Sequence, residues 1–284
     1  MKILCITPID HLPKVKSELS SFGSLKIIDD PKTIEDIAQE LKTSEVIFTN
    51  PNKSKIYLGK NITDLAPNLK IICTASTGTN HIDKEHMQSQ NIKVLAITQE
   101  KDITKKISST AEHAMALTLS SVRSVPQSFM SVKEGKWDYT PFIGRQFDSL
   151  CIGIVGLGRL GSMYARFMKP LAKHIMYYDP YVFVKEAWLE KQEDLTKMFE
   201  LCDIISLHVH VDARTTGLIN KSLLNKAKEN LLIVNTSRGE IVNEIDLIEF
   251  LRENKNAKYA TDVLENEVRM TDKTANSLVN LSLN

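Results

Sequence analysis

The sequence predicts a two-domain α/β protein built on parallel β-sheets, and three observations support this fold class. Its 284 residues exceed one small domain, because domains usually contain roughly 100–200 residues. Short apolar runs alternate with amphipathic helical stretches along most of the chain. A glycine-rich turn, Gly156–Gly161, joins one apolar run to one helical stretch.

The N-terminal part alternates strand-like and helix-like stretches, as expected of a parallel sheet covered by helices. Strands or helices are expected at Lys2–Thr7, Leu12–Leu19, Leu25–Ile28, Thr33–Leu41, Glu45–Thr49, Leu69–Thr74 and Lys93–Ile97. We interpret this part as a flavodoxin-like α/β domain. A long helical pattern follows at Ile107–Val125 and stops before Pro126, whose ring and missing N–H oppose its continuation. We place the domain boundary near residue 98, which gives domains of residues 1–98 and 99–284.

The second domain shows a cleaner alternation, typical of a Rossmann-type doubly wound parallel sheet. Strands are expected at Cys151–Val155, Ile175–Tyr178, Asp203–His208, Leu231–Asn235 and Lys258–Asp262. Helices are expected at Arg159–Lys173, near Leu195–Glu200 and at Asn243–Asn254. Sheets of this kind bind dinucleotides at the carboxyl ends of their strands.

The turn Gly156-Leu157-Gly158-Arg159-Leu160-Gly161 has the spacing and the flanking elements of a dinucleotide site. Gly156 permits the tight turn, Gly158 lets the backbone approach a pyrophosphate, and Gly161 allows helix and strand to pack closely. Asp179 ends the next strand, eighteen residues after Gly161, near the spacing of a ribose-binding acid. A carboxylate there binds the ribose hydroxyls and repels a 2′-phosphate, so we expect NAD rather than NADP.

The amino-acid composition limits the classes of partner that the protein is expected to bind. Lys and Arg total 36 against 35 Asp and Glu, so net charge favours neither a nucleic acid nor an acidic membrane. The cysteines, Cys5, Cys73, Cys151 and Cys202, lack paired metal-ligand spacing, and we expect buried, reduced thiols and no metal. The N-terminal apolar run is too short for a signal peptide, and no stretch reaches the ~20 apolar residues of a membrane span. We therefore expect a cytoplasmic protein that acts on a small molecule.

Three further motifs, taken with the glycine turn, resemble those of the D-isomer-specific 2-hydroxyacid dehydrogenases, most closely the phosphoglycerate dehydrogenase-like branch. They are Ser76-Thr77-Gly78-Thr79-Asn80-His81-Ile82-Asp83, Thr110-Ala111-Glu112-His113-Ala114 with Gly135-Lys136-Trp137, and Asn235-Thr236-Ser237-Arg238-Gly239. The resemblance runs from about residue 40 to the last residue. It implies an NAD-dependent oxidoreductase that transfers a hydride between the nicotinamide and a D-2-hydroxy or 2-oxo acid.

The resemblance also implies roles for single residues. Around the cofactor, it places Arg159 and Leu160 at the pyrophosphate, His208 beside the nucleotide, Thr236, Ser237 and Arg238 at the nicotinamide side, and Asp262 at the carboxamide. Thr77 and Gly78 would offer backbone N–H groups to the substrate carboxylate, a role that a small-residue loop after a strand supports independently. Residues 1–98 thereby become the substrate domain and residues 99–284 the NAD-binding domain. In the family, the long helix and its exit form a dimer interface, so a homodimer is implied.

Two residues are candidates for the chemistry. Arg238 carries a planar, permanently charged guanidinium that can hold a carboxylate and polarise the adjacent carbonyl. A lone arginine is most often a surface ion pair, but its place between an apolar strand and a glycine at the cofactor edge favours a functional role. Glu267, five residues after Asp262, aligns with the family acid that holds the catalytic histidine charged, and Glu265 is a near competitor.

The catalytic histidine of the family, usually in a Pro-His pair after the last strand of the cofactor domain, is not found. The histidines are His11, His81, His86, His113, His174, His208 and His210, and none follows Glu267. We do not expect His81 or His113 to replace it, because a structural histidine is the commoner outcome at such positions. The last residues, Asn280–Asn284, resemble the strand before that pair, so we expect a piece of an ordinary enzyme rather than a short protein that binds NAD without efficient turnover. The alternative function is an NAD-sensing, non-catalytic interaction protein, as in corepressors that share this fold.

Overall fold

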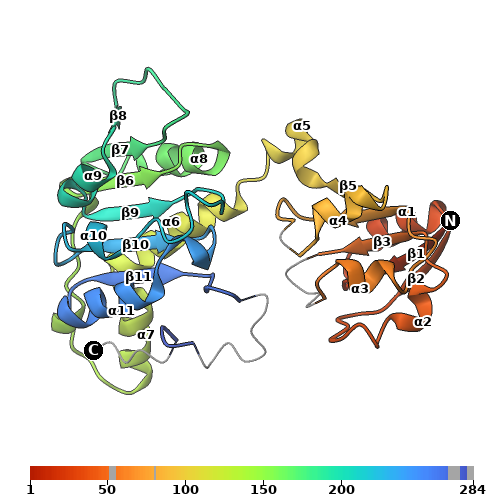
Figure 1. The fold of residues 1–284 in the computed structure, drawn as a ribbon. Helices are drawn as coiled ribbons and strands as arrows, with labels where there is room; N and C mark the ends of the chain where they lie inside the picture. Colours follow the sequence, from red (N-terminus) through yellow and green to blue (C-terminus); the bar gives the residue numbers. More distant parts are fainter. Residues whose placement is uncertain (51–55, 80, 268–275, 280–284) are drawn as a thin grey trace. The chain divides into compact units, whose positions relative to one another are not determined.

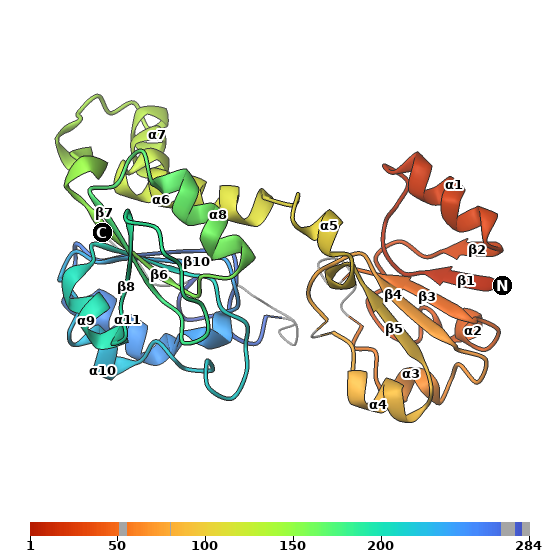
Figure 2. The same cartoon turned by 90° about the horizontal axis from the view of Figure 1, so that it is seen from above.

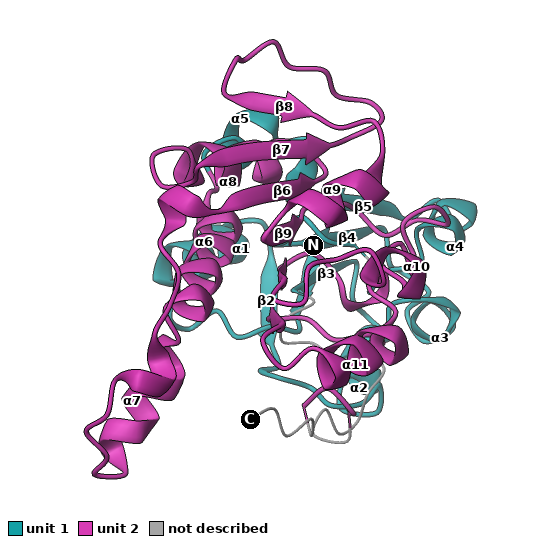
Figure 3. Ribbon diagram, turned by 90° about the vertical axis from the view of Figure 1, so that its left-hand side faces the viewer, with its two compact units in different colours: residues 1–106 teal, residues 107–284 magenta. Residues whose placement is uncertain are grey.

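The computed structural model describes residues 1–50, 56–79, 81–267 and 276–279. The chain divides into two compact units, Met1–Lys106 and Ile107–Asn284, coloured separately in Figure 3. By this division the turn Ile97–Gln99 and helix α5 (Lys101–Thr104) belong to the first unit, and the functional boundary expected near residue 98 stays a prediction. No helix in the described ranges is long and apolar enough to cross a membrane.

Unit 1 contains, in its described part, a five-stranded parallel sheet with the order β2-β1-β3-β4-β5. Its strands are β1 (Lys2–Cys5), β2 (Ser24–Ile27), β3 (Val46–Thr49), β4 (Ile71–Thr74) and β5 (Lys93–Ala96). This strand order is that of flavodoxin-like folds, as the sequence predicted. In such an order, the loops after β3 and β4 lie at the same carboxyl edge of the sheet.

The helices of unit 1 bury one face of this sheet more fully than the other. They are α1 (Pro13–Ser21), α2 (Ala38–Leu41), α3 (Lys60–Thr63), α4 (Lys84–Ser89) and α5. Leu41, Ile62 and Met87 join the strand residues Ile47 and Ile72 in one buried cluster. Helix α1 buries no residue, and Figure 2 shows it on the opposite side of the sheet from α3 and α4.

Unit 2 contains, among its described residues, a six-stranded parallel sheet with the order β11-β10-β9-β6-β7-β8. Its strands are β6 (Cys151–Val155), β7 (His174–Tyr178), β8 (Leu189–Lys191), β9 (Ile204–Leu207), β10 (Leu232–Asn235) and β11 (Lys258–Thr261). This is the doubly wound order, in which the two halves of the sheet meet between β6 and β9. A ligand of such a sheet binds at the carboxyl edge beside that junction.

Helices cover both faces of the second sheet (Figure 1). The helices of unit 2 are α6 (Ser109–Val122), α7 (Val125–Lys133), α8 (Arg159–Met168), α9 (Leu195–Leu201), α10 (Lys221–Leu224) and α11 (Glu244–Glu253), with short 3-10 turns at Thr140–Phe142, Phe147–Ser149 and Gly239–Ile241. Helix α7 buries no residue and extends away from the sheet in Figure 3. Residues of α6 and α8 pack on one face, and residues of α9 and α11 pack on the other. Strands buried on both faces read as continuous apolar runs, which explains the sequence of β6 and β10.

One helix, α6, fills most of the helical pattern Ile107–Val125, and a second helix, α7, starts at its last residue. Helix α6 ends at Val122, and Ser124 takes a left-handed backbone conformation with a φ of 50°. Pro126 then lies in the first turn of α7, where its missing N–H would have had no helical partner. Pro126 therefore follows the end of α6 and lies in the first turn of α7.

Candidate active site

The glycine turn lies between β6 and α8, at the carboxyl edge of the sheet of unit 2. Gly156 has a φ of 90°, and a Cβ atom there would lie 2.7 Å from the backbone oxygen of His208. A Cβ atom on Gly161 would lie 2.0 Å from the backbone oxygen of Gly156. A Cβ atom on Gly158 would meet nothing within 4 Å. The turn is therefore closed at two glycines and open at the third, beside the N-terminus of α8, where free N–H groups favour an anion.

Asp179 follows β7 and lies directly beside this turn. Its Oδ2 accepts a hydrogen bond from the Leu157 N–H at 2.9 Å. Its Oδ1 accepts from the N–H groups of Tyr181 and Val182 at 2.9 and 3.1 Å. The carboxylate is thus fixed in orientation by three backbone donors, and one of them belongs to the glycine turn itself.

Tyr181 and Arg214 form a contact beside Asp179 that the sequence did not predict. The guanidinium carbon of Arg214 lies 5.4 Å from the centre of the Tyr181 ring, and its Nη1 donates to the tyrosine hydroxyl. Arg214 also forms an ion pair of 2.7 Å with Asp212. The two segments are far apart in sequence, so only the fold brings the chain after β7 next to the loop after β9.

His208 follows β9 and closes the other side of the glycine turn. Its Nε2 lies 2.8 Å from the Ser206 hydroxyl, and its ring centre lies 5.1 Å from that of Tyr164 on α8. Burial lowers the pKa of His208 to about 4, so its ring is neutral at pH 7. The structure places this side chain against the turn as a neutral hydrogen-bonding group, and its role beside a nucleotide stays a prediction.

Arg159 and Leu160 begin α8. The Arg159 guanidinium donates to the backbone oxygen of Ile107, at the start of unit 2. Leu160 is half-buried and packs against the cluster that fills the α6 and α8 face. The side chain of Arg159 therefore has a protein partner in this structure, and a role at a pyrophosphate stays a prediction.

The segment Asn235–Gly239 follows β10 and is organised by Asn235, whose role the sequence did not reveal. The Asn235 Nδ2 donates to the backbone oxygen of Arg238 at 2.9 Å, and its Oδ1 accepts from the Ser237 N–H at 3.0 Å. The Ser237 hydroxyl donates to the backbone oxygen of Leu207 at 2.6 Å. Because Asn235 is fully buried, these bonds hold the backbone beneath Arg238 in one conformation.

Thr236 and Arg238 of this segment differ in how their polar groups are bonded. The Thr236 hydroxyl is buried and has no hydrogen-bond partner in the described chain. The Arg238 guanidinium donates to the backbone oxygen of Ser237 at 2.6 Å and is half-buried. A buried hydroxyl without a partner costs free energy, and a bound molecule that hydrogen-bonds to it would remove that cost.

The segment that follows β11 packs against the arginine segment at Gly239. A Cβ atom there would lie 2.0 Å from the backbone carbon of Leu264 and 2.1 Å from the Glu265 nitrogen. Glu267 accepts from the Leu264 N–H through Oε2 at 3.2 Å, so its carboxylate closes its own turn. Burial, with the carboxyl groups of Glu244 and Glu240 nearby, raises the pKa of Glu265. Both candidate acids therefore lie on the turn that contacts Gly239, in different surroundings.

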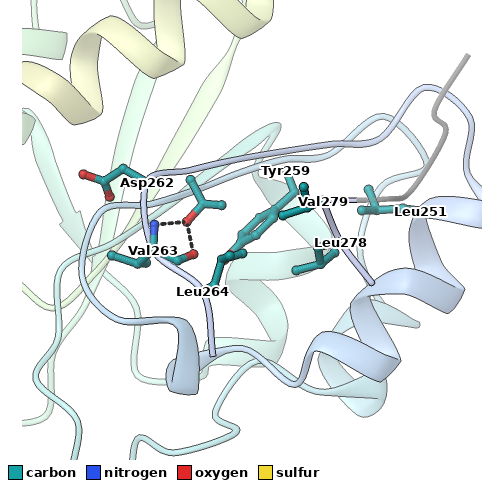
Figure 4. A pocket seen from close by; sticks show the side chains of 8 residues that line it. Leu251, Tyr259, Asp262, Val263, Leu264, Leu278 and Val279 are labelled. Atoms are coloured by element: carbon teal, nitrogen blue, oxygen red, sulfur yellow. Dashed lines mark hydrogen bonds between the residues drawn. The ribbon is translucent and has the colours of Figure 1, made fainter. Parts of the chain in front are cut away.

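Asp262 lies at the end of β11 and pairs with His113 of α6, at 3.6 Å between Oδ2 and Nε2. A cavity of about 340 Å³ lies beside it. The cavity is lined by Leu251, Tyr259, Thr261, Asp262, Val263, Leu264, Leu278 and Val279. Figure 4 shows Asp262 pointing away from the apolar side chains of this cavity, while Thr261 bonds to the backbone of Val263.

In unit 1, the predicted substrate loop follows β4. The Ser76 hydroxyl donates to the backbone oxygen of Gly78 at 2.7 Å and accepts from the Thr74 hydroxyl at 2.9 Å. Asn80 lies outside the described residues. His81 is buried, neither ring nitrogen has a partner in the described chain, and burial lowers its pKa to about 4. Thr77 and Gly78 belong to a loop fixed by two hydroxyl groups.

The residues of unit 2 fit a dinucleotide. Gly158 leaves open space at a helix N-terminus, Asp179 presents an oriented carboxylate, and Thr236 offers a buried hydroxyl without a partner. The carboxyl ends of β6, β7, β9, β10 and β11 supply these groups from one edge of the sheet. The residues Asn280–Asn284 were expected to resemble the strand before a Pro-His pair. They lie outside the described residues.

Comparisons with known proteins agree with this geometry. Residues 115–283 match the model of the D-isomer specific 2-hydroxyacid dehydrogenase, NAD binding domain. The chain is 34% identical over 249 residues to a D-3-phosphoglycerate dehydrogenase of Archaeoglobus fulgidus, covering 87% of this chain and 46% of that protein. The chain spans about half the length of the curated phosphoglycerate dehydrogenases it matches.

Two solved structures show the same likeness. An NAD-dependent formate dehydrogenase of Staphylococcus aureus, in complex with NAD, aligns with a TM-score of 0.82 and 26% identity, over 96% of this chain and 84% of that one. A D-lactate dehydrogenase of Aquifex aeolicus, complexed with NAD and lactic acid, aligns with a TM-score of 0.79 and 26% identity, over 94% of this chain and 78% of that one.

Proposed function

Because this chain belongs to the D-isomer-specific 2-hydroxyacid dehydrogenase family, we propose that unit 2 binds NAD for hydride transfer between the nicotinamide and a D-2-hydroxy or 2-oxo acid. The observation that carries the proposal is the hydrogen bond from the Leu157 N–H to Asp179. It joins the turn that would hold the pyrophosphate to the carboxylate that would hold the ribose. A 2′-phosphate would bring two negative charges against this carboxylate, which favours NAD over NADP.

NAD, when bound, accepts or donates the hydride. The open turn at Gly158 would hold its pyrophosphate, Asp179 its ribose, and Thr236 and Ser237 the nicotinamide side. Asp262 has one oxygen 3.6 Å from His113, and we assign its carboxylate to the carboxamide of the nicotinamide. His208, being neutral at pH 7, would offer a hydrogen bond without adding charge near the phosphates.

Arg238 would bind and polarise the 2-oxo acid, since a guanidinium can contact a carboxylate and a carbonyl together. Thr77 and Gly78 would bind the substrate carboxylate through backbone N–H groups. Glu267 remains the proposed acid partner of a catalytic base, with Glu265 as its competitor. Glu267→Gln and Glu265→Gln distinguish them in the slow turnover that the chain retains, because only the true partner should shift the pH profile of that turnover.

We further propose that this chain reduces 2-oxo acids slowly. Reduction of a 2-oxo acid needs a proton donor, and a general acid contributes typically 10²–10⁴-fold to the rate. His81 and His208 both have pKa values of about 4 and are therefore poor proton donors near pH 7. NADH oxidation measured with a panel of 2-oxo acids tests this, and rapid turnover of any of them contradicts it. Tight NADH binding without turnover would favour the NAD-sensing role.

The surface of α7 and the chain after it supports a homodimer. Large apolar side chains there are exposed, among them Phe129 at 61%, Trp137 at 91% and Tyr139 at 80%. Several large apolar side chains exposed in one short stretch of chain are candidates for an interaction site.

The described cysteines are all free thiols, which supports a cytoplasmic location.

The cofactor assignment is tested by titrating the full chain with NADH and with NADPH, following nucleotide fluorescence. Asp179→Asn should weaken NADH binding about tenfold or more and narrow the preference over NADPH, because it removes the charge while keeping an acceptor oxygen. Asp194→Asn is the matched control, since Asp194 also accepts from a backbone N–H, at the N-cap of α9. Unchanged NADH affinity in Asp179→Asn would overturn the assignment.

A further inference from the structure

Two cysteines lie side by side at the amino edge of the sheet of unit 2. Cys151 is the first residue of β6, and Cys202 lies just before β9. Their Sγ atoms are 3.5 Å apart and share a hydrogen bond. Cys202 is fully buried, whereas Cys151 is half-buried. Cofactor binding uses the opposite, carboxyl edge of the same strands.

We propose that Cys151 and Cys202 form an oxidisable thiol pair, which a hydroperoxide converts into a disulfide that joins β6 to the chain entering β9. The proposal does not depend on the proposed dehydrogenase function. Its site consists of two sulfur atoms and the charged groups around them, all within unit 2.

The backbone already holds the two cysteines in register. The Asp203 N–H donates to the Cys151 oxygen at 2.8 Å, and the Asp203 carboxylate accepts from the Cys151 N–H at 2.8 Å. A side chain at Gly153 would lie 3.0 Å from the Cys202 Sγ, so the glycine leaves the space that this thiol occupies. A disulfide has an S–S distance of about 2.05 Å, so each sulfur needs only a small displacement.

The surroundings distinguish the two thiols. The hydrogen bond from Cys202 lowers the pKa of Cys151, and the positive charge of Lys228 lowers it further. Burial and the negative charges of Asp203 and Glu190 raise this pKa, but the net shift is downward. The same bond and burial raise the pKa of Cys202. Arg145 and Lys228 contact the Asp203 carboxylate at 2.7 and 2.9 Å, which offsets its charge beside the thiols. Cys151 is therefore the attacking thiolate and Cys202 the resolving thiol.

The oxidation balances with the peroxide as the oxidant. The Cys151 thiolate attacks one peroxide oxygen, an S–O bond forms, the O–O bond breaks, and the released oxygen leaves as water or an alcohol after taking a proton. The Cys202 sulfur then attacks the Cys151 sulfur, the S–S bond forms, the S–O bond breaks, and the hydroxyl leaves as water with the Cys202 proton. Two electrons pass from the thiols to the peroxide, and a dithiol reductant reverses the change.

The disulfide would cross-link the two halves of the doubly wound sheet at their junction. Closing a loop of about fifty residues restricts the unfolded chain, so oxidation should raise the Tm by roughly 5–10 °C. The glycine turn and His208 lie at the far ends of β6 and β9, so oxidation should leave NADH affinity within about twofold.

The test treats the full chain with hydrogen peroxide, then maps the peptides by mass spectrometry and measures the Tm before and after dithiothreitol. We expect a Cys151–Cys202 cross-linked peptide within one chain and a Tm rise that the reductant reverses. Cys73→Ser is the matched control, since Cys73 is also half-buried and should not affect the cross-link. Cys151→Ser should abolish it.

Mapping of the unsubstituted chain decides the question even if a cysteine variant fails to fold. A Cys202 that stays free while Cys151 becomes a sulfinic acid would overturn the proposal. A cross-link between chains, seen on a non-reducing gel, would overturn it as well. A cross-linked peptide with no change in Tm would refute the stabilising role.

Discussion

Replacing Gly158 by alanine separates a phosphate-binding turn from a merely structural one. The new methyl group would meet no protein atom within 4 Å, and the φ of −70° suits alanine. Alanine is a poorer N-cap than glycine by roughly 0.5–1 kcal/mol, while the less flexible unfolded chain contributes about 0.4–1 kcal/mol in the opposite direction. These effects nearly cancel, so the free energy of unfolding should change by less than about 1 kcal/mol.

NADH binding should respond differently. A pyrophosphate that rests on this backbone has no room for a methyl group, so we expect an affinity loss of at least about tenfold, equivalent to about 1.4 kcal/mol. The assays are a fluorescence titration with NADH and thermal unfolding without nucleotide. Gly161→Ala is the contrasting variant, because its methyl group would lie 2.0 Å from the backbone oxygen of Gly156 and should reduce stability itself. A Gly158→Ala protein that binds NADH normally would refute the reasoning.

Three further predictions concern stability and assembly. Burial lowers the pKa of His81 from 6.5 to about 4. The stability is therefore fully present above pH 6.5. Between pH 6.5 and pH 4 the unfolded chain binds a proton that the folded chain does not, so the free energy of unfolding falls by up to about 3 kcal/mol. Urea unfolding should show this loss, His81→Phe should flatten it, and exposed His11→Phe should not. Asp203→Asn should cost about 2 kcal/mol in the same assay, because it leaves Arg145 and Lys228 without their carboxylate. Phe129→Lys on α7 should convert the proposed homodimer to a monomer in sedimentation velocity, with the Tm of a matched Ser128→Lys protein as the control for folding.

Sequence patterns predicted the elements that follow from local chemistry. Both sheets, the strand before the glycine turn and the helix after it appear where apolar alternation and glycine spacing placed them. Helix α2 is shorter than the expected Thr33–Leu41, because the Asp36 carboxylate accepts from the N–H groups of Lys32 and Thr33 and holds a turn there. Strand β8 and helix α10 are too short to give a periodic signal.

The parts of the candidate site that the sequence did not reveal depend on contacts across the fold. Asn235 was visible only as one letter of a motif, and its bond to the Tyr259 hydroxyl at 3.1 Å forms because β10 and β11 lie side by side. Likewise, Arg214 reaches Tyr181 only because the chain ends of β7 and β9 meet at one edge of the sheet. Local patterns identify such residues as polar but give no information about their partners.

The close backbone contact at Gly239 limits how the candidate site can change during evolution. Its missing side chain lets the backbone carrying Arg238 rest directly on the backbone of Leu264 and Glu265. Arg238, Glu265 and Glu267 therefore lie on two backbone segments that touch directly, with no side chain between them at Gly239. In the proposed site, mutations in the outer loops would alter which molecule is bound and leave the spacing of the charged groups unchanged.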